Sequence, residues 1–194
     1  GADDVTGLAA LPDGALAIAG TYGDRAELRD LTLPALFDDD HGDGFVATLD
    51  AAGAVRWVRT FGGPSADTCA GVAATADGVV VAGTVRGAVD VAGRRLEVAG
   101  AADGLVAYFD RAGAVRATVL VGGADFDGLT AVVAHADTAV VAGWFSGTLA
   151  GATAAGGDDA MLATVTPAGV AAVTPLTSDG LTTLHGLAAD PDGW

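Results

Sequence analysis

Aspartate is the residue type of this chain whose spacing could do chemistry, because it recurs in three columns at intervals of roughly 60 residues. Aspartate side chains close local turns by accepting hydrogen bonds from nearby backbone amides, so we interpret the columns first as architecture. The alternative is a ring of oxygen ligands for Ca²⁺ at one face of the fold. The columns are Asp3, Asp67 and Asp127; Asp13, Asp77, Asp137 and Asp192; and Asp43, Asp103 and Asp159.

The densest group of carboxylates is the run DDDHGDG at residues 38–44. Within it, Asp38, Asp40 and Asp43 are the candidate metal ligands, since clustered carboxylates around glycine can form a Ca²⁺ loop. The alternation of such a loop is out of register here, and no bidentate glutamate follows at the EF-hand spacing. A solvated acidic turn is the favoured interpretation. We therefore expect no cofactor, and Ca²⁺ is the alternative.

Residues suited to other chemistry are scattered. The three histidines occupy different positions of the repeat, and the three serines lack the Gly-x-Ser-x-Gly setting of a hydrolase. The single cysteine, Cys69, excludes an internal disulfide and is expected to pack in the core. The sequence therefore predicts neither a zinc site nor a serine hydrolase.

Aromatic residues supply the candidate binding residues. Trp144 and Phe145 follow an apolar run, and Tyr22 occupies the position of Phe145 in an earlier copy of the same motif. Aromatic side chains at strand ends most often pack between sheets, which is the favoured interpretation. If they are exposed, Trp144, Phe145 and Tyr22 would form a contact patch.

The elements that must position these residues repeat along the chain. Apolar runs that end at Gly20, Gly83 and Gly143 lie 63 and 60 residues apart. Each unit predicts four short strands with glycine-rich turns, which is the layout of a propeller blade. The fold class is therefore all-β, a β-propeller built from four-stranded antiparallel blades, with about three and a quarter blades in this chain. The units span residues 1–62, 63–122 and 123–177, and a fourth begins at 178–194.

Turn chemistry predicts where strands begin within a unit. Asp77-Gly78 is expected to form the two central residues of a type I′ hairpin, whereas Thr138 resists positive φ and predicts another turn type. The third strands are expected at 45–50, 105–110 and 161–166. The connection in the first unit is longer than its counterparts, and residues 24–31 within it could make a short helical turn.

Composition excludes several classes of function. A net charge of -16 argues against nucleic-acid binding, which depends on Lys and Arg to neutralise phosphates. No run of 18 apolar residues is present, so we expect no membrane span. A propeller needs at least four blades. We therefore expect the ring to be completed by further residues of the same protein, with closure between two copies as the alternative.

Several motifs resemble one known repeat family. Residues 63–67 (GPSAD) open the second unit, Asp77-Gly78 precedes the strand VVVAG, and residues 156–163 (GGDDAMLA) lead into a third strand. Together with the VRWVR strand around Trp57, they resemble the bacterial SBBP-type β-propeller repeat over essentially the whole chain. The lysine of that repeat is replaced here by Thr48, Tyr108 and Thr164.

This resemblance implies a secreted or cell-surface module of a seven-bladed type. The expected function is non-catalytic: interaction with a protein or glycan partner, or a structural scaffold. The alternative is part of a propeller enzyme, a lyase or glycoside hydrolase, whose active site needs further blades. Propeller folds host many unrelated functions, so the choice has to be made from the site.

Overall fold

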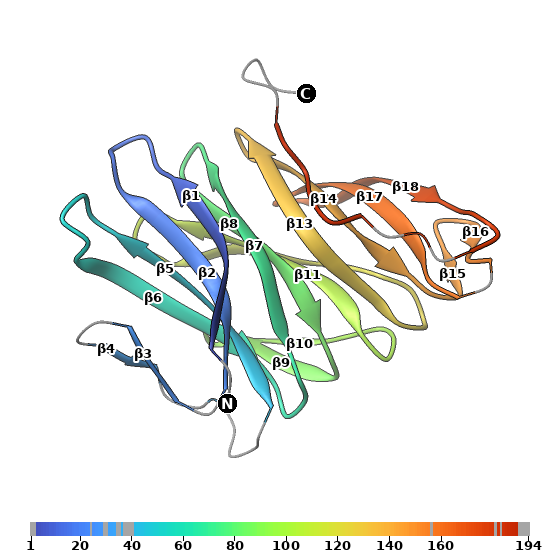
Figure 1. Ribbon diagram of the computed structural model, residues 1–194, viewed down its shortest axis with the longest axis horizontal. Coiled ribbons are helices and arrows are strands. Elements are labelled where there is room, and N and C mark those ends of the chain that lie inside the picture. Colours follow the sequence, from blue (N-terminus) through green and yellow to red (C-terminus); the bar gives the residue numbers. More distant parts are fainter. Residues whose placement is uncertain are drawn as a thin grey trace.

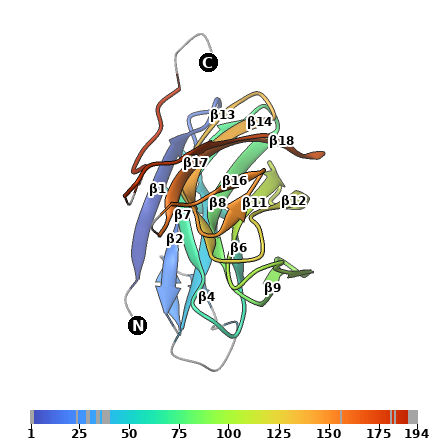
Figure 2. The ribbon, with the colours of Figure 1, turned by 90° about the vertical axis from the view of Figure 1, so that its right-hand side faces the viewer.

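Three antiparallel sheets lie side by side along the chain (Figure 1). The computed structural model describes residues 3–23, 25–28, 31–33, 36, 41–155, 157–180, 182 and 184–189. These residues form strands, turns and extended segments without a helix. Seen from the side of the third sheet, the sheets stand one behind the other (Figure 2). The all-β class is therefore confirmed.

Each sheet is built from four long strands that pair in chain order. In the first sheet these are β1 (Asp4–Ala10), β2 (Leu16–Gly23), β5 (Gly42–Leu49) and β6 (Val55–Gly62). In the second they are β7 (Thr68–Thr75), β8 (Gly78–Val85), β11 (Asp103–Asp110) and β12 (Val115–Val121). In the third they are β13 (Asp127–His135), β14 (Thr138–Phe145), β17 (Asp159–Thr166) and β18 (Gly169–Leu176). The expected third strands correspond to β5, β11 and β17.

A small hairpin connects the second and third strands of every sheet. The hairpins are β3 (Ala26–Leu28) with β4 (Leu31–Leu33), β9 (Ala88–Val91) with β10 (Arg94–Glu97), and β15 (Thr148–Leu149) with β16 (Ala152–Thr153). The short helical turn expected at residues 24–31 is therefore wrong, because β3 and β4 pair there. The β9 strand also pairs with the end of β6, which ties the second unit to the first sheet.

The turn at Asp77-Gly78 differs from the expectation by one residue. Thr75 pairs with Gly78, so the two central residues are Ala76 and Asp77, and Gly78 is the first residue of β8. In the third sheet His135 pairs with Thr138, and the positive φ of 51° falls on Ala136. Thr138 thus begins a strand and does not have to adopt the conformation that its β-branched side chain resists.

The core lies between the sheets, and β8 contributes to both interfaces. Val79 and Val81 belong to the cluster between the first and second sheets, whereas Val80 and Ala82 belong to the cluster between the second and third. Because successive strand residues point to opposite faces, the second sheet is buried on both sides. This pattern explains why its strands are almost continuously apolar.

Thr182 and Leu184 continue the array beyond the third sheet. The N–H of Thr182 donates to Asp158 O (3.4 Å), as Asp67 N–H donates to Gly42 O (2.8 Å) and Asp127 N–H to Ala102 O (2.9 Å). The Thr130 hydroxyl then donates to Leu184 O (2.7 Å), which places this segment beside β13 (Figure 1). Within the described residues the sheets form an open array, with no closed ring.

A threonine at a bulge in the first strand of a sheet links neighbouring sheets. The register shifts at Thr6, Ala70 and Thr130, which are equivalent positions of β1, β7 and β13. The Thr6 hydroxyl donates to Cys69 O (2.6 Å), as the Thr130 hydroxyl does to Leu184 O. Alanine at position 70 has no hydroxyl to make the equivalent bond to the third sheet.

We predict that Ala70→Thr stabilises the protein by supplying this missing hydrogen bond. The free energy of unfolding should rise by about 0.5–1.5 kcal/mol, the usual net value of one such bond. Denaturant unfolding measures the difference. Ala70→Val is the matched control, since it adds similar volume without a hydroxyl, and an equal gain in both variants would contradict the prediction.

Candidate functional site

The first aspartate column binds backbone amides at the junctions between sheets. Asp67 is fully buried, and its two carboxylate oxygens accept hydrogen bonds from the N–H groups of Gly63 (2.6 Å) and Arg86 (2.8 Å). Asp127 accepts the N–H of Gly123 in the same way (2.6 Å), and Asp3 accepts that of Gly23 (3.2 Å). These carboxylates hold local backbone in place, as expected for an architectural role.

The aspartates at the start of the third strands accept hydrogen bonds from backbone amides of the segment that precedes each strand. Asp43 accepts the N–H of Leu36 (3.3 Å) and Asp103 that of Ala99 (2.7 Å). Asp159 accepts the N–H groups of Ala155 (3.0 Å) and Ser178 (3.2 Å). The three carboxylates are buried, so they are not available at the surface.

These two columns meet at each junction between sheets. A Cβ built on Gly122 would overlap Asp103 Oδ1 and lie 3.0 Å from Asp127 Oδ2, so both carboxylates border the same point. Burial raises the pKa of both groups. At the preceding junction burial raises the pKa of Asp67 from 3.8 to about 6, and the nearby Asp43 adds to the rise.

The candidate metal ligands are only partly described. Asp38 and Asp40 lie outside the described residues, whereas Asp43 is buried beneath Gly62. Among the residues that the structure describes, no three His, Cys, Asp or Glu side chains gather closely enough to hold a metal ion. Ca²⁺ therefore stays an untested alternative. The described part of the chain likewise contains no helix long and apolar enough to cross a bilayer.

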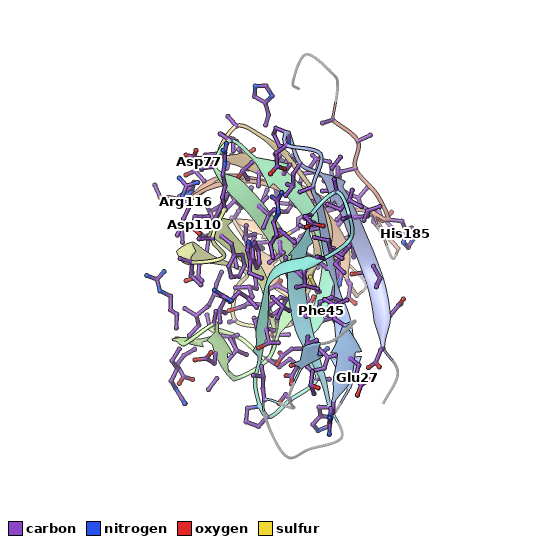
Figure 3. All side chains as sticks on the ribbon, turned by 90° about the vertical axis from the view of Figure 1, so that its left-hand side faces the viewer. Glu27, Phe45, Asp77, Asp110, Arg116 and His185 are labelled. Carbon is purple, nitrogen blue, oxygen red and sulfur yellow. The ribbon has the colours of Figure 1, made fainter. Side chains whose placement is uncertain are left out.

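The three candidate aromatic residues lie in different environments. Tyr22 is fully buried beneath the β3–β4 hairpin and packs edge-on against Phe45, labelled in Figure 3, with ring centroids 6.2 Å apart. Phe145 is fully buried between the second and third sheets. Trp144 alternates with it along β14, points to the opposite face and is partly exposed. Of the three, Trp144 is the one that solvent reaches.

A cavity of about 80 Å³ lies between the first and second sheets, at the end where β1 turns into β2 and β7 into β8. Thr48 of β5 and Thr75 of β7 line it from opposite sides. Both side chains are more than nine-tenths buried. The two hydroxyl oxygens have no hydrogen-bond partner among the described residues. A buried hydroxyl without a partner costs about 1–3 kcal/mol, which makes the pair unusual.

Three hydrogen bonds hold the walls of the cavity, and one of them, from Trp57 to Arg111, crosses the junction. Arg56 donates to Asp13 (2.6 Å), and this bond lowers the pKa of the Asp13 carboxyl. Trp57 donates its indole N–H to Arg111 O (3.0 Å), and the Arg111 guanidinium donates to Ala76 O (3.0 Å). The cavity is therefore lined by one aromatic residue and by charged residues of both signs, and the two unpaired hydroxyl oxygens are buried in its walls.

At the corresponding end of the next junction, no pair of hydroxyls is unpaired among the described residues, whereas at its other end Asp103 Oδ1 and Asp127 Oδ1 are buried without a partner. There Tyr108 takes the place of Thr48, and its hydroxyl donates to Val165 O (2.9 Å). Figure 3 shows Arg116 near Asp77 and Asp110 at that edge, and Arg116 also pairs with Asp137 (2.9 Å). The sequence shows Thr48 where the next unit has Tyr108, but nothing in the sequence indicates that the Thr48 hydroxyl lacks a partner.

Comparison with known proteins does not assign this chain to a family. No protein-family model matches the chain, and no curated protein matches it significantly. The resemblance to the SBBP-type repeat therefore stays a proposal that rests on the motifs themselves.

We predict that the buried aspartates make the protein more stable at mildly acidic pH. A folded-state pKa near 6 for Asp67, above its ordinary 3.8, means that the folded state binds more protons over this interval. The contribution of Asp67 to the free energy of unfolding is then largest below its ordinary pKa and is lost as the pH rises through 6. Moving from about pH 7 to about pH 5 should raise the Tm by about 2–4 °C.

Calorimetry of Asp67→Asn across the same interval is the control. Asparagine cannot titrate, so the dependence of Tm on pH should become shallower whatever its effect on Tm itself. An identical dependence in both proteins would contradict the assignment to Asp67.

We also predict that Gly122→Ala lowers the free energy of unfolding by about 1–3 kcal/mol, the usual range for overpacking. The added methyl group would overlap the Asp103 carboxylate and crowd Asp127. Gly180→Ala is the matched control, because a methyl group added there would meet no atom within 4 Å. Equal denaturation midpoints for the two variants would show that the junction accepts a side chain.

Proposed function

We propose that the three sheets are blades of a β-propeller, and that the protein is a non-catalytic extracellular or cell-surface module that interacts with a protein or glycan partner. One observation supports this proposal above all. The polar residues that recur in the repeat bind backbone at equivalent places, which is the behaviour of a scaffold.

Threonine and aspartate illustrate this behaviour. The Thr21 hydroxyl accepts the N–H of Cys69 (3.1 Å), and the Thr84 hydroxyl accepts that of Leu129 at the next junction (3.2 Å). The buried aspartates of the first and third columns, such as Asp67 and Asp159, bind the amides of neighbouring turns. Catalysis by a lyase or hydrolase requires carboxylates that reach a substrate, whereas these are buried and committed to backbone.

Cys69 also supports a non-catalytic role. Its side chain is buried, and burial raises the pKa of the thiol to about 12. The nucleophilic form of cysteine is the thiolate, so this residue is unreactive at neutral pH.

Native affinity electrophoresis in gels that contain soluble polysaccharides tests the proposal. With a net charge of -16 the protein migrates readily, so binding is seen as slower migration than in a gel without polysaccharide. We predict slower migration without loss of polysaccharide staining around the band. A cleared zone would contradict the proposal and favour the enzyme alternative. Unchanged migration with every polysaccharide would assign the partner to the protein class.

A further inference from the structure

The small hairpin of the third unit is shorter than that of the second unit. In the second unit β9 spans Ala88–Val91, whereas in the third β15 spans only Thr148–Leu149. Both hairpins start at equivalent places. The carbonyl of Ala88 lies against Gly63, and that of Thr148 lies against Gly123. The residues that the third unit lacks are therefore those at the far end of β9.

The far end of β9 covers the outer edge of the first sheet. Asp90 and Val91 pair with the last two residues of β6. The N–H of Ala92 then donates to Thr60 O (3.2 Å). The hairpin of the second unit thus adds a strand to the sheet before it, and the outward carbonyl of Thr60 is satisfied.

A side chain satisfies the next outward carbonyl of β6. Along an edge strand, the backbone groups of every second residue point to the same side, so Val58 O faces outward as Thr60 O does. The Arg59 guanidinium donates to Val58 O (2.7 Å). The outer edge of the first sheet is therefore closed by a strand and by an arginine.

The outer edge of the second sheet has neither device. Leu120 is equivalent to Thr60, because it pairs with Leu105 as Thr60 pairs with Phe45. Val119 stands where the first sheet has an arginine and cannot donate a hydrogen bond. Among the described residues, β12 pairs only with β11. Leu120 is partly exposed, so its outward N–H and C=O can be reached from solvent.

The third sheet protects the same position with proline. Pro175 pairs with Met161 of β17, which places it in register with Leu120. Proline has no N–H to donate, and it is one of the residues that keep edge strands from pairing with another chain. Of the three outer edges, one is covered, one is blocked and that of β12 is open. In Figure 2, β12 lies at the same edge of the array as β9.

The packing beside this edge indicates which side chains an added strand would carry. The core cluster of the first junction includes Val89 and Val91 of β9. The cluster of the second junction includes Leu149, which corresponds to Val89, but the shorter hairpin supplies no counterpart of Val91. An added strand with an apolar residue at that point would complete the cluster.

Charge selects between two possible sources of such a strand. The chain carries a net charge of -16, and the exposed Asp125 lies against Gly147 at the base of the short hairpin. This field attracts a segment rich in Lys and Arg and repels a second copy of the same acidic chain.

We propose that the outer edge of β12, over residues 118–122, binds an extended basic segment of a protein partner as an added antiparallel strand. The inference rests on the proposed function as an interaction module and selects the protein class of partner. Main-chain hydrogen bonds to Leu120 and Gly122 supply affinity, and an apolar residue at the place of Val91 supplies specificity.

Fluorescence anisotropy with a labelled short peptide in which Lys and Val alternate tests the inference. The matched probe is the same peptide with a methylated backbone, which has no N–H groups to donate. A peptide in which Glu replaces Lys tests the part played by charge. We expect the Lys–Val peptide to bind best and to shift the NMR amide signals of Leu120 and Gly122.

Two variants close the edge in different ways. Leu120→Pro reproduces the proline of the third sheet, and a graft of residues 88–97 in place of residues 148–153 restores the longer hairpin. Each should weaken binding of the Lys–Val peptide by about tenfold or more, as expected for the loss of one or two backbone hydrogen bonds. Val170→Thr is the control, because Val170 is 41% exposed on β18 and lies away from this edge. It should bind like the unmodified protein.

Four results would overturn the inference. They are no binding of the Lys–Val peptide, equal affinity for the methylated peptide, unchanged affinity in both edge variants, or self-association in sedimentation that Leu120→Pro abolishes. The last result would assign the edge to a second copy of the chain.

The polysaccharide gels keep these outcomes separate from the proposed function. If the Lys–Val peptide does not bind but migration is slowed without a cleared zone, the module binds glycan and only the assignment of the edge fails. A cleared zone together with peptide binding at Leu120 would overturn the non-catalytic proposal and leave the edge as a docking site.

Discussion

Every described junction between sheets depends on one backbone hydrogen bond. The N–H of the aspartate at the start of a sheet's first strand donates to the carbonyl of the residue before the third-strand aspartate of the preceding sheet, as Asp67 does to Gly42 and Asp127 to Ala102. The side chain of the donor residue then binds the glycine amide four residues earlier. Because Asp67, Asp127 and Ala102 are buried and Gly42 is half-buried, the bond would be costly to leave unmade, and this requirement sets where each sheet packs on the preceding one.

At the junction of the second and third sheets, two aspartates lie close to each other and to a glycine. Carboxylates from two sheets border the space above Gly122, and burial shifts both toward the protonated form. A residue with a side chain would separate them and break the contact between the sheets. The glycine at position 122 is thus a steric condition for the close approach of Asp103 and Asp127.

Much of this fold could be predicted because strand periodicity and turn residues are local. The third strands and the sequential pairing follow from the spacing of apolar runs and glycines. The β3–β4 hairpin could not be predicted because residues 24–31 are rich in charge and carry no alternation strong enough to distinguish a short strand from a helical turn. The buried positions of Tyr22 and Phe145 fit the packing that aromatic strand ends favour. The unpaired hydroxyls of Thr48 and Thr75 could not be predicted either, since a missing partner depends on what faces a residue across two sheets.

The bonds from Thr6 to Cys69 and from Thr130 to Leu184 join each sheet only to the unit that follows it in the chain. The described junctions likewise connect consecutive units, as in an array whose stability is a sum of nearest-neighbour terms. Such a chain can fold during its synthesis, because each finished sheet presents the template for the first strand of the next sheet as that strand leaves the ribosome. Thr182 and Leu184 already occupy the place that the third sheet offers to the strand after it.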